Sequence, residues 1–151
     1  MIELVGDLWE AHSLGNWVAI TTNGVARTDG SCAMGRGVAL EAAKKFPYLP
    51  YELGDRIRKW GNHVHAFGTL RILSFPVKHH WRDSADMLLI HQSALEISSD
   101  KLADLVRYPI YMVRPGCGNG RLRWQDVRHA LSEILDDRFI VVERADENRL
   151  C

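Results

Sequence analysis

Three glycines stand at the junction between an expected strand and an expected helix, in the segment Gly116-Cys117-Gly118-Asn119-Gly120. An apolar, β-like run (residues 108–113) precedes this segment, and an amphipathic helix is expected to begin near Trp124. Glycine tolerates positive φ and leaves backbone N–H groups uncovered, so such a loop can wrap an anion. The following helix would add the positive end of its dipole. A plain tight turn is the alternative interpretation of this loop.

Another glycine-rich loop, from Thr28 to Gly37, lies upstream and also leads into an expected helix. Because it comes earlier in the chain, it is called the first glycine loop below, and the segment 116–120 is called the second. Two loops of this kind in one small domain suggest a ligand that carries a diphosphate. Taken alone, each loop is equally consistent with a tight turn. Their joint presence therefore favours, without requiring, a phosphate site.

Expected strands alternate with expected helices along the chain. Apolar and β-branched runs indicate strands, whereas amphipathic or alanine-rich stretches indicate helices. This alternation predicts an α/β layered domain with a parallel or mixed sheet, whose ligand lies beyond the carboxyl ends of the strands. Both glycine loops and the segment 76–82 follow strands, so they can converge at one rim. We expect strands over residues 1–5, 17–22, 66–75 (or a hairpin there), 109–113 and 139–142, and helices over residues 35–46, 51–59, 86–105 and 124–135.

The length of 151 residues fits one domain, and we assign residues 1–151 to it, because there is no internal repeat, low-complexity tract or linker. The final residues, 144–151, are interpreted as a polar tail. Lys+Arg and Asp+Glu both number 19, which argues against a bulk electrostatic grip on nucleic acid but leaves room for a local basic patch.

The cysteine pattern and the N-terminus indicate a reducing compartment. Cys32, Cys117 and Cys151 are odd in number and widely spaced, so neither a disulfide framework nor a zinc site is expected. The N-terminus lacks a signal pattern, and no apolar stretch is long enough to span a membrane. We therefore expect a cytoplasmic protein without a membrane partner, and a monomer.

The segment Phe75–Arg82 places one lysine, two histidines and an arginine directly after an expected strand. Partial burial and nearby cations lower the pKa of a lysine and free its amine lone pair, which can then attack an electrophilic carbon such as the anomeric carbon of a ribose. His79 or His80 can move a proton near neutral pH. We take Lys78 and His80 as the candidate catalytic residues. The alternative is a strand end with solvated basic side chains and a packed Trp81.

Other polar residues have both a binding and a local structural interpretation. Asp7 can accept a hydrogen bond from a purine amine or cap a helix, and Asn23 can bind sugar hydroxyls or shape a turn. Cys32 and Cys117 lack a local activating histidine, so packing is favoured over nucleophilic chemistry. His63 and His65 have no acidic or cysteine ligand nearby, and we expect no metal site.

Four segments together resemble a macrodomain, in the same order and over nearly the whole chain. They are IELVGDLWE (residues 2–10), ITTNGVARTDGSCAMGRGVALEAAKKFP (20–47), FPVKHHWR (75–82) and GCGNGRLRWQDV (116–127). The third is similar to the Phe-Pro-Thr-Lys-x-His-Trp segment of the DNA ADP-ribosyl glycohydrolase antitoxins. The resemblance points to the branch that holds these enzymes and the terminal ADP-ribose protein glycohydrolase.

This resemblance implies a three-layer α/β/α sandwich with a mixed central sheet that binds ADP-ribose and needs no cofactor. Lys78 would attack the anomeric carbon of the distal ribose, and Asp7 would contact the adenine amine with Leu8 beside it. The macromolecule that carries the ADP-ribose would be DNA or protein. The ligand-binding set that the resemblance implies is Asp7, Leu8, Thr22, Asn23, Ser31, Cys32, Ala33, Met34, Gly35, Gly37, Val38, Pro76, Lys78, Pro115, Gly116, Cys117, Gly118, Asn119, Gly120, Arg121 and Leu122.

The chain departs from the pattern of its branch at three places. Gly120 stands where the terminal protein glycohydrolase has an aspartate, and Arg121 replaces the second glycine of the antitoxin pattern Gly-x-Gly-Asn-Gly-Gly-Leu. Residues 26–30 lengthen the first loop. Arg121 could add a phosphate contact, and the longer loop could reshape the distal ribose pocket.

The function expected from the resemblance is a hydrolase that removes ADP-ribose from a nucleobase or a protein side chain. Two alternatives remain open at this point: a phosphatase acting on ADP-ribose 1″-phosphate, and a reader that binds ADP-ribose without turning it over. A nucleic-acid-binding module using basic residues of the region 36–59 is a further class, disfavoured by the zero net charge.

Overall fold

The computed structural model describes residues 1–144, and the predicted polar tail after Arg144 lies outside the described residues. Its centre is a six-stranded sheet in the order β1-β6-β5-β2-β4-β3. The strands are parallel except for β3, which runs antiparallel to β4 at one edge. The strands are β1 (Ile2–Val5), β2 (Trp17–Asn23), β3 (Ala66–Phe67), β4 (Ile72–Lys78), β5 (Ile110–Val113) and β6 (Phe139–Glu143).

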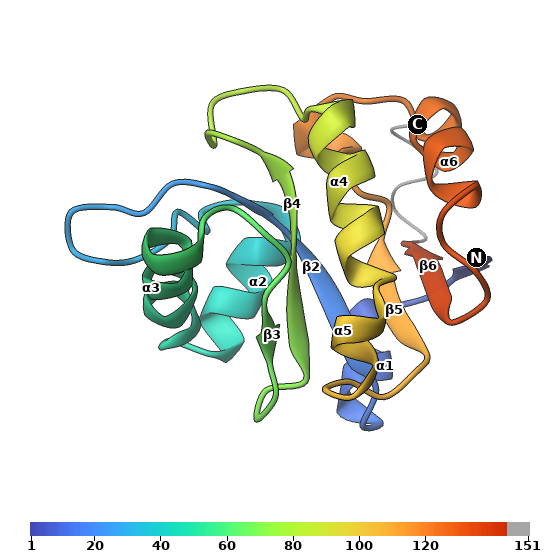
Figure 1. Cartoon of the computed structure of the whole chain (residues 1–151), viewed down its shortest axis with the longest axis horizontal. Coiled ribbons are helices and arrows are strands. Elements are labelled where there is room, and N and C mark those ends of the chain that lie inside the picture. Colours follow the sequence, from blue (N-terminus) through green and yellow to red (C-terminus); the bar gives the residue numbers. More distant parts are fainter. Residues whose placement is uncertain (145–151) are drawn as a thin grey trace.

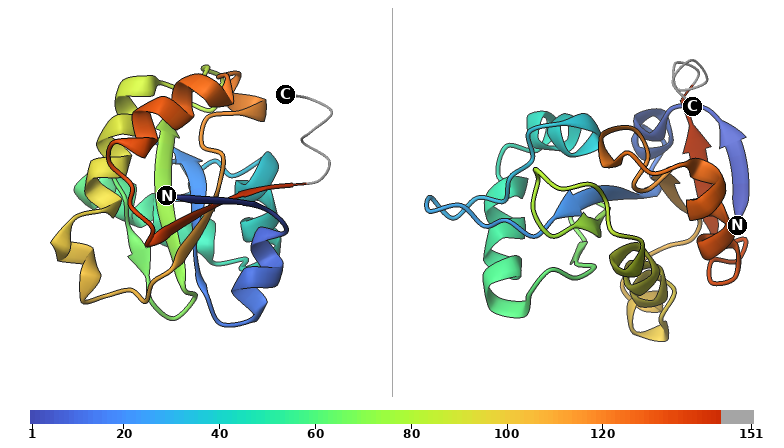
Figure 2. Two further views of the ribbon diagram at one scale, coloured as in Figure 1. Left: turned by 90° about the vertical axis from the view of Figure 1, so that its right-hand side faces the viewer. Right: turned by 90° about the horizontal axis from the view of Figure 1, so that it is seen from above.

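Helices cover both faces of this sheet, as Figures 1 and 2 show. One face packs against α1 (Leu8–Ser13), α2 (Gly37–Lys45) and α3 (Leu49–Trp60). The other packs against α4 (Met87–Ile97), α5 (Asp100–Ala103) and α6 (Trp124–Ser132). The predicted α/β/α sandwich with a mixed sheet is therefore confirmed.

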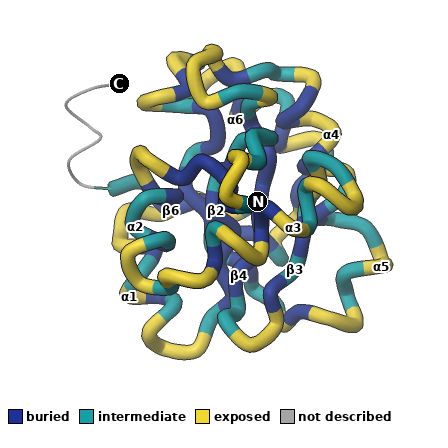
Figure 3. Tube along the Cα trace, turned by 90° about the vertical axis from the view of Figure 1, so that its left-hand side faces the viewer, coloured by how far each residue is buried: buried dark blue, intermediate teal, exposed yellow. Residues whose placement is uncertain are grey.

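The alternation of side chains along β2 divides the core between the two faces. Trp17 and Ala19 belong to the buried cluster on the α4 side, whereas Val18 and Ile20 belong to the cluster on the α2 side. Successive side chains of a strand point to opposite faces, so a strand covered on both sides is apolar throughout. Buried segments accordingly run through the middle of the molecule, and the outer turns of the helices are exposed (Figure 3).

Two helical regions need comment. The range 86–105 is mostly helical, as predicted, but it holds two helices, because α4 ends at Ile97 and a separate short helix, α5, begins at Asp100. Ser98 and Ser99 separate the two, and serine favours helix ends because its hydroxyl competes for backbone hydrogen bonds. Helix α1 was not predicted. It has six residues, and Asp7 caps it by accepting a hydrogen bond from the Trp9 N–H at 2.8 Å.

The remaining elements lie close to their predicted ranges. Helix α3 begins at Leu49, before the predicted start at Tyr51, and Pro50 lies in its first turn, where its missing N–H costs nothing. Helix α6 ends at Ser132, three residues before the predicted end at Leu135. The segment 66–75 forms the hairpin alternative, with β3 paired antiparallel to β4.

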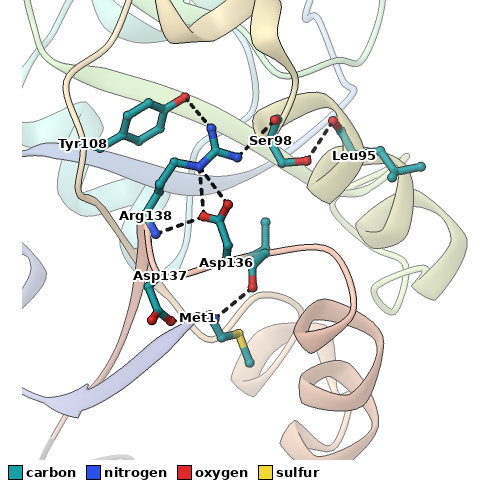
Figure 4. Close-up of polar contacts among 8 residues, drawn as sticks. Met1, Leu95, Ser98, Tyr108, Asp136, Asp137 and Arg138 are labelled. Carbon is teal, nitrogen blue, oxygen red and sulfur yellow. Dashed lines mark hydrogen bonds and ion pairs between the residues drawn. The ribbon is translucent and has the colours of Figure 1, made fainter.

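The end of the sheet opposite the glycine loops is held by a polar network (Figure 4). The Arg138 Nε donates to both carboxylate oxygens of Asp136, at 2.9 and 3.0 Å. The Arg138 guanidinium also lies over the ring of Tyr108, 4.9 Å from its centroid. The Met1 ammonium donates to the Leu135 carbonyl at 2.9 Å and pairs with Asp137. These contacts connect β1, β5 and β6 at their amino ends.

Within residues 1–144, no helix combines the length and the apolar character needed to span a bilayer. In the same range, no three His, Cys, Asp or Glu side chains are grouped so that they could hold a metal ion. His63 instead contacts the Glu96 carboxylate at 2.7 Å, and His65 is buried with its Nε2 at 3.0 Å from the Gly61 carbonyl.

Candidate active site

A cavity of about 740 Å³ lies beyond the carboxyl ends of β2, β4 and β5. Its volume is in the range typical of small-molecule sites, and its place is the one where open α/β sheets bind ligands. The two glycine-rich loops and the end of β4 contribute to it, so the predicted convergence at one rim is confirmed. The lining residues are Thr21, Thr22, Asn23, Arg27, Ala33, Met34, Gly35, Arg36, Gly37, Val38, Ala39, Val77, Lys78, Trp81, Val113, Arg114, Gly116, Cys117, Gly118, Asn119, Gly120 and Arg144.

A β-bulge brings Lys78 to this cavity. Thr22 pairs with Pro76, but the next residue of β2, Asn23, pairs with Lys78, so that Val77 is the extra residue. Such irregularities redirect a side chain at the end of a strand. Pro76 next to the bulge supplies no N–H to the ladder, which helps explain why regular pairing stops there.

The Lys78 ammonium group lies between the loop after β4 and the loop after β5. Its Nζ donates to the Asn119 carbonyl at 3.2 Å and is 3.4 Å from the Trp81 carbonyl. Partial burial, followed by the charges of Arg121 and Arg36, lowers the pKa of Lys78 below its ordinary value of 10.5, and Asp83 opposes this shift. The predicted combination of a strand-end lysine with nearby cations is therefore present.

The second glycine-rich loop folds back on itself over η1 (Gly118–Gly120). Gly116 and Gly118 have φ of +78° and +69°, which glycine adopts without the strain that a side chain would bring. The Leu122 N–H donates to the Gly116 carbonyl at 3.0 Å and closes the loop. A Cβ at Gly120 would lie 2.9 Å from the Ala85 Cβ, so the aspartate that the resemblance gives to the terminal protein glycohydrolase at this place does not fit here without a shift.

The first loop is held by its own polar side chains. Asn23 donates from Nδ2 to the Ala33 carbonyl at 2.8 Å and accepts from the Val25 N–H at 3.0 Å, so its amide supports the loop from the cavity wall. Residues 26–32 form a hairpin-like extension beside α3 (Figure 1), closed by a bridge between Ala26 and Cys32. A Cβ at Gly37 would lie 3.3 Å from the Asn119 Nδ2, which shows how closely the two glycine loops approach each other.

The cavity is strongly cationic although the chain has no formal net charge. Its described lining residues include four arginines and one lysine but no aspartate, glutamate or histidine. Two of these arginines are paired, Arg114 with Glu143 at 3.0 Å and Arg144 with Glu41. Local positive potential together with open backbone N–H groups suits an anionic ligand.

Thirteen predicted ligand-binding residues line the cavity: Thr22, Asn23, Ala33, Met34, Gly35, Gly37, Val38, Lys78, Gly116, Cys117, Gly118, Asn119 and Gly120. Eight others lie outside its lining: Asp7, Leu8, Ser31, Cys32, Pro76, Pro115, Arg121 and Leu122. Leu8 and Cys32 are buried in the core on the α2 side, and Asp7 caps α1. Arg121 is exposed and acts on Lys78 through its charge. The proposed contacts of these eight residues with a ligand stay predictions.

The two histidines after Lys78 do not line the cavity either. His79 Nε2 lies 2.9 Å from an Asp86 carboxylate oxygen, which lowers the pKa of Asp86. His80 accepts a hydrogen bond at Nδ1 from the Arg82 N–H at 3.1 Å, and its ring contacts the Trp81 ring. Proton transfer by His80 therefore stays a prediction.

The cysteines differ in setting. Burial raises the pKa of the Cys32 thiol to about 12, so this side chain is a packing residue, as predicted. Cys117 is half-buried at the cavity wall, and Cys151 lies outside the described residues.

Sequence reasoning did not select several lining residues, among them Arg27, Arg36, Trp81, Arg114 and Arg144. Trp81 could have been predicted from the sequence, because it stands three residues after Lys78 in the same basic segment. Arg144 follows β6 and enters the site through tertiary packing against α2, for which the sequence carries no local signal.

No protein-family model matches the sequence. A DNA ADP-ribosyl glycohydrolase from Thermus aquaticus is 34% identical over 120 residues, which cover 68% of this chain and 31% of that protein. This chain thus spans about a third of the length of the curated relative it matches.

Solved macrodomains have the same fold. The macrodomain of Thermus aquaticus DarG superposes with a TM-score of 0.70 at 26% identity, covering 94% of this chain and 97% of that one. The macrodomain of Mycobacterium tuberculosis DarG gives a TM-score of 0.72 at 21% identity, with 94% and 98% covered. Thermosipho africanus DarTG in complex with ADP-ribose gives 0.76 at 20% identity, covering 97% of this chain and 42% of that one.

The sheet order, the two helical layers and the cavity between glycine loops therefore define a macrodomain, and this chain belongs to the macrodomain family. Within that family, the sequence and the structure are both similar to DarG, in agreement with the resemblance found in the sequence.

Proposed function

We propose that this chain binds ADP-ribose in the cavity and hydrolyses the bond that joins its distal ribose to a nucleobase or a protein side chain. Three observations support binding: the cavity volume, its cationic lining and the two glycine loops that meet across it. The names of the relatives point the same way, since one is a DNA ADP-ribosyl glycohydrolase and another was solved in complex with ADP-ribose.

The observation that carries the catalytic part is the position of Lys78. Its amine is within hydrogen-bond distance of the Asn119 loop, and its pKa is lowered by burial and by Arg121 and Arg36. A lowered pKa increases the share of neutral amine near neutral pH, and only the neutral amine has a lone pair for attack. Among the described lining residues no carboxylate or imidazole offers an alternative base or could activate the Cys117 thiol, so Lys78 is the lining residue best suited to nucleophilic chemistry.

The proposed reaction has two displacements at the anomeric carbon. In the first, the Lys78 nitrogen forms a bond to this carbon, the bond to the leaving group breaks with its electron pair, and the leaving group gains a proton. The lysine nitrogen loses a proton as it becomes bonded to carbon. In the second, water takes the place of the lysine nitrogen, releases ADP-ribose and returns a proton to the amine.

The ligand would lie along the rim with its diphosphate between the glycine loops. Backbone N–H groups of the loop 116–120 and the side chain of Arg36 would supply the contacts that phosphates favour. In this arrangement the distal ribose would lie beside Lys78. The adenosine would extend toward the end of β1, where Asp7 is the predicted partner of the adenine amine.

Turnover by wild type and Lys78→Ala tests the proposal. ADP-ribosylated oligonucleotide and ADP-ribosylated peptide are incubated with each protein, and released ADP-ribose is quantified. We expect wild type to release ADP-ribose from one of them, Lys78→Ala to release none, and Lys101→Ala, an exposed lysine on α5, to match wild type. Full activity in Lys78→Ala would refute the role of the lysine.

The same assay separates the two alternative functions. Release of phosphate from ADP-ribose 1″-phosphate, without release of ADP-ribose from either macromolecule, would indicate a phosphatase instead. Binding of ADP-ribose without turnover of any of these substrates would indicate a reader. Either result would overturn the hydrolase proposal while leaving the binding site intact.

A further inference from the structure

We propose that the Trp81 indole is a stacking surface for the nucleobase attached to the distal ribose, which makes Trp81 a specificity-determining residue for base-linked ADP-ribose. This inference rests on the proposed function and adds to it the chemical class of the leaving group.

Trp81 lies beside the proposed nucleophile. Its backbone carbonyl is 3.4 Å from the Lys78 Nζ, and the residue is part of the cavity lining. A group attached to the carbon that Lys78 attacks would therefore lie close to the loop 79–85. Trp81 is 45% exposed, so it keeps free surface for a ligand.

The loop that carries Trp81 is fastened on several sides. The Gly24 N–H donates to the His79 carbonyl at 3.2 Å, and the Ala85 N–H donates to the Gly120 carbonyl at 2.9 Å. Asn62 Nδ2 donates to the Lys78 carbonyl at 3.1 Å. These bonds join the loop to the segment after β2 and to the glycine loop at Gly120, and they join Lys78, just before the loop, to the segment after α3. A surface that is already ordered loses little entropy when a ligand stacks on it.

The surroundings of the indole favour stacking of a base over contact with an amino-acid side chain. The Arg82 guanidinium lies 4.8 Å from the centroid of the Trp81 ring, and the His80 ring is tilted by 32° against it at 5.2 Å. A cation on an indole is a cation–π contact, and aromatic side chains backed by arginine are typical of sites that stack bases. The carboxylate and hydroxyl groups of a protein substrate carry no aromatic ring that could stack on the indole.

Charges in the cavity lining, at Arg27 and Arg36, and beside lining residues in the sequence, at Arg82 and Arg121, support the same substrate class. Arg27, Arg36, Arg82 and Arg121 make no ion pair with a carboxylate among the described residues. Arginines without acidic partners can bind the phosphates of a strand that continues beyond the modified base. A protein substrate would supply such charges only if its sequence were acidic.

The test compares affinities, so it does not depend on turnover. Wild-type and Trp81→Ala proteins, each in a Lys78→Ala background, are titrated with ADP-ribose, with a single-stranded oligonucleotide carrying ADP-ribose on one base, and with an ADP-ribosylated peptide. Trp81→Ala should weaken oligonucleotide binding about 5- to 150-fold, the range for stacking of a base on an aromatic side chain. Its affinities for ADP-ribose and for the peptide should stay within about twofold, since neither stacks on the indole.

Two further variants sharpen the comparison. Trp81→Phe keeps an aromatic face and should recover most of the oligonucleotide affinity. Trp60→Ala removes another tryptophan, 69% exposed and outside the cavity, and should change none of the affinities. Equal weakening of all three ligands by Trp81→Ala, or weakening of none, would overturn the inference.

The outcome also separates this inference from the proposal beneath it. If wild type does not bind ADP-ribose, the proposed function fails and the stacking inference fails with it. If ADP-ribose binds and the oligonucleotide is indifferent to Trp81, only the stacking inference fails.

Discussion

Replacement of Gly54 by alanine tests how the first loop is held at the cavity. Gly54 is buried in α3, and a Cβ there would lie 2.0 Å from the Gly30 carbonyl oxygen and 2.9 Å from the Cys32 nitrogen. Both are backbone atoms, so neither can rotate away as a side chain would. The Cys32 N–H also donates to the Pro50 carbonyl at 2.7 Å. The added methyl group must therefore push the loop and α3 apart.

The expected loss of stability follows from three contributions. Alanine in place of glycine stabilises an unobstructed helix by about 1 kcal/mol. Overpacking costs about 1–3 kcal/mol, and loss of the Cys32 to Pro50 hydrogen bond costs about 1 kcal/mol. The net destabilisation is about 1–3 kcal/mol, which in a domain of this size lowers Tm by about 2–12 °C.

Thermal unfolding of Gly54→Ala beside Gly68→Ala measures this difference. Gly68 is exposed between β3 and β4, and a Cβ there meets nothing within 4 Å, so its variant should unfold within about 0.5 kcal/mol of wild type. Since the displaced loop carries Arg27 to the cavity, Gly54→Ala should also bind ADP-ribose more weakly. A Tm at or above that of wild type would refute the described packing of the loop on α3.

Three further changes have definite outcomes. Arg121→Ala removes a charge that lowers the pKa of Lys78, so the rise of kcat/KM with pH should move to higher pH; an unmoved profile would contradict this. Asp86 caps α4 by accepting a hydrogen bond from the Leu88 N–H, so Asp86→Ala should lower the free energy of unfolding by about 1 kcal/mol and Asp86→Asn by less. Equal losses in denaturant unfolding would argue against capping. The His79 contact lowers the pKa of Asp86. The stability that the ionised Asp86 carboxylate adds to the folded protein is therefore present above pH 3.8 and is lost as the pH falls through the lowered pKa. Cys32 should resist iodoacetamide at pH 8 until unfolding, and rapid native labelling in peptide mapping would disprove its burial.

Much of the fold follows from local patterns that this sequence carries strongly. The apolar runs at 17–22 and 109–113 become central strands buried on both faces, and their carboxyl ends place both glycine loops at one rim. Elements held by a few polar contacts were harder to predict. Helix α1 has only six residues, too short to show helical periodicity, and its one local signal is the Asp7 cap.

The candidate site was predictable to the extent that its residues lie in loops with a sequence signal. Lys78 and the glycines of both loops were selected, whereas Arg36 and Arg114 were not, because a single arginine has no pattern that points to a cavity. The bulge at Val77 depends on how β4 pairs with β2, which a linear sequence does not show. Leu8, which the resemblance puts near the ligand, is fully buried in the core on the α2 side, and its contact with a ligand stays a prediction.

The most direct test of the account is a calorimetric titration of ADP-ribose into wild type and Lys78→Ala side by side. Both proteins should bind ADP-ribose, because the glycine loops and the arginines hold the diphosphate and Lys78 acts on the bond beyond it. Absence of binding to folded wild-type protein would contradict the proposed function, since the cavity would then have another ligand and the reaction assigned to Lys78 would have no substrate.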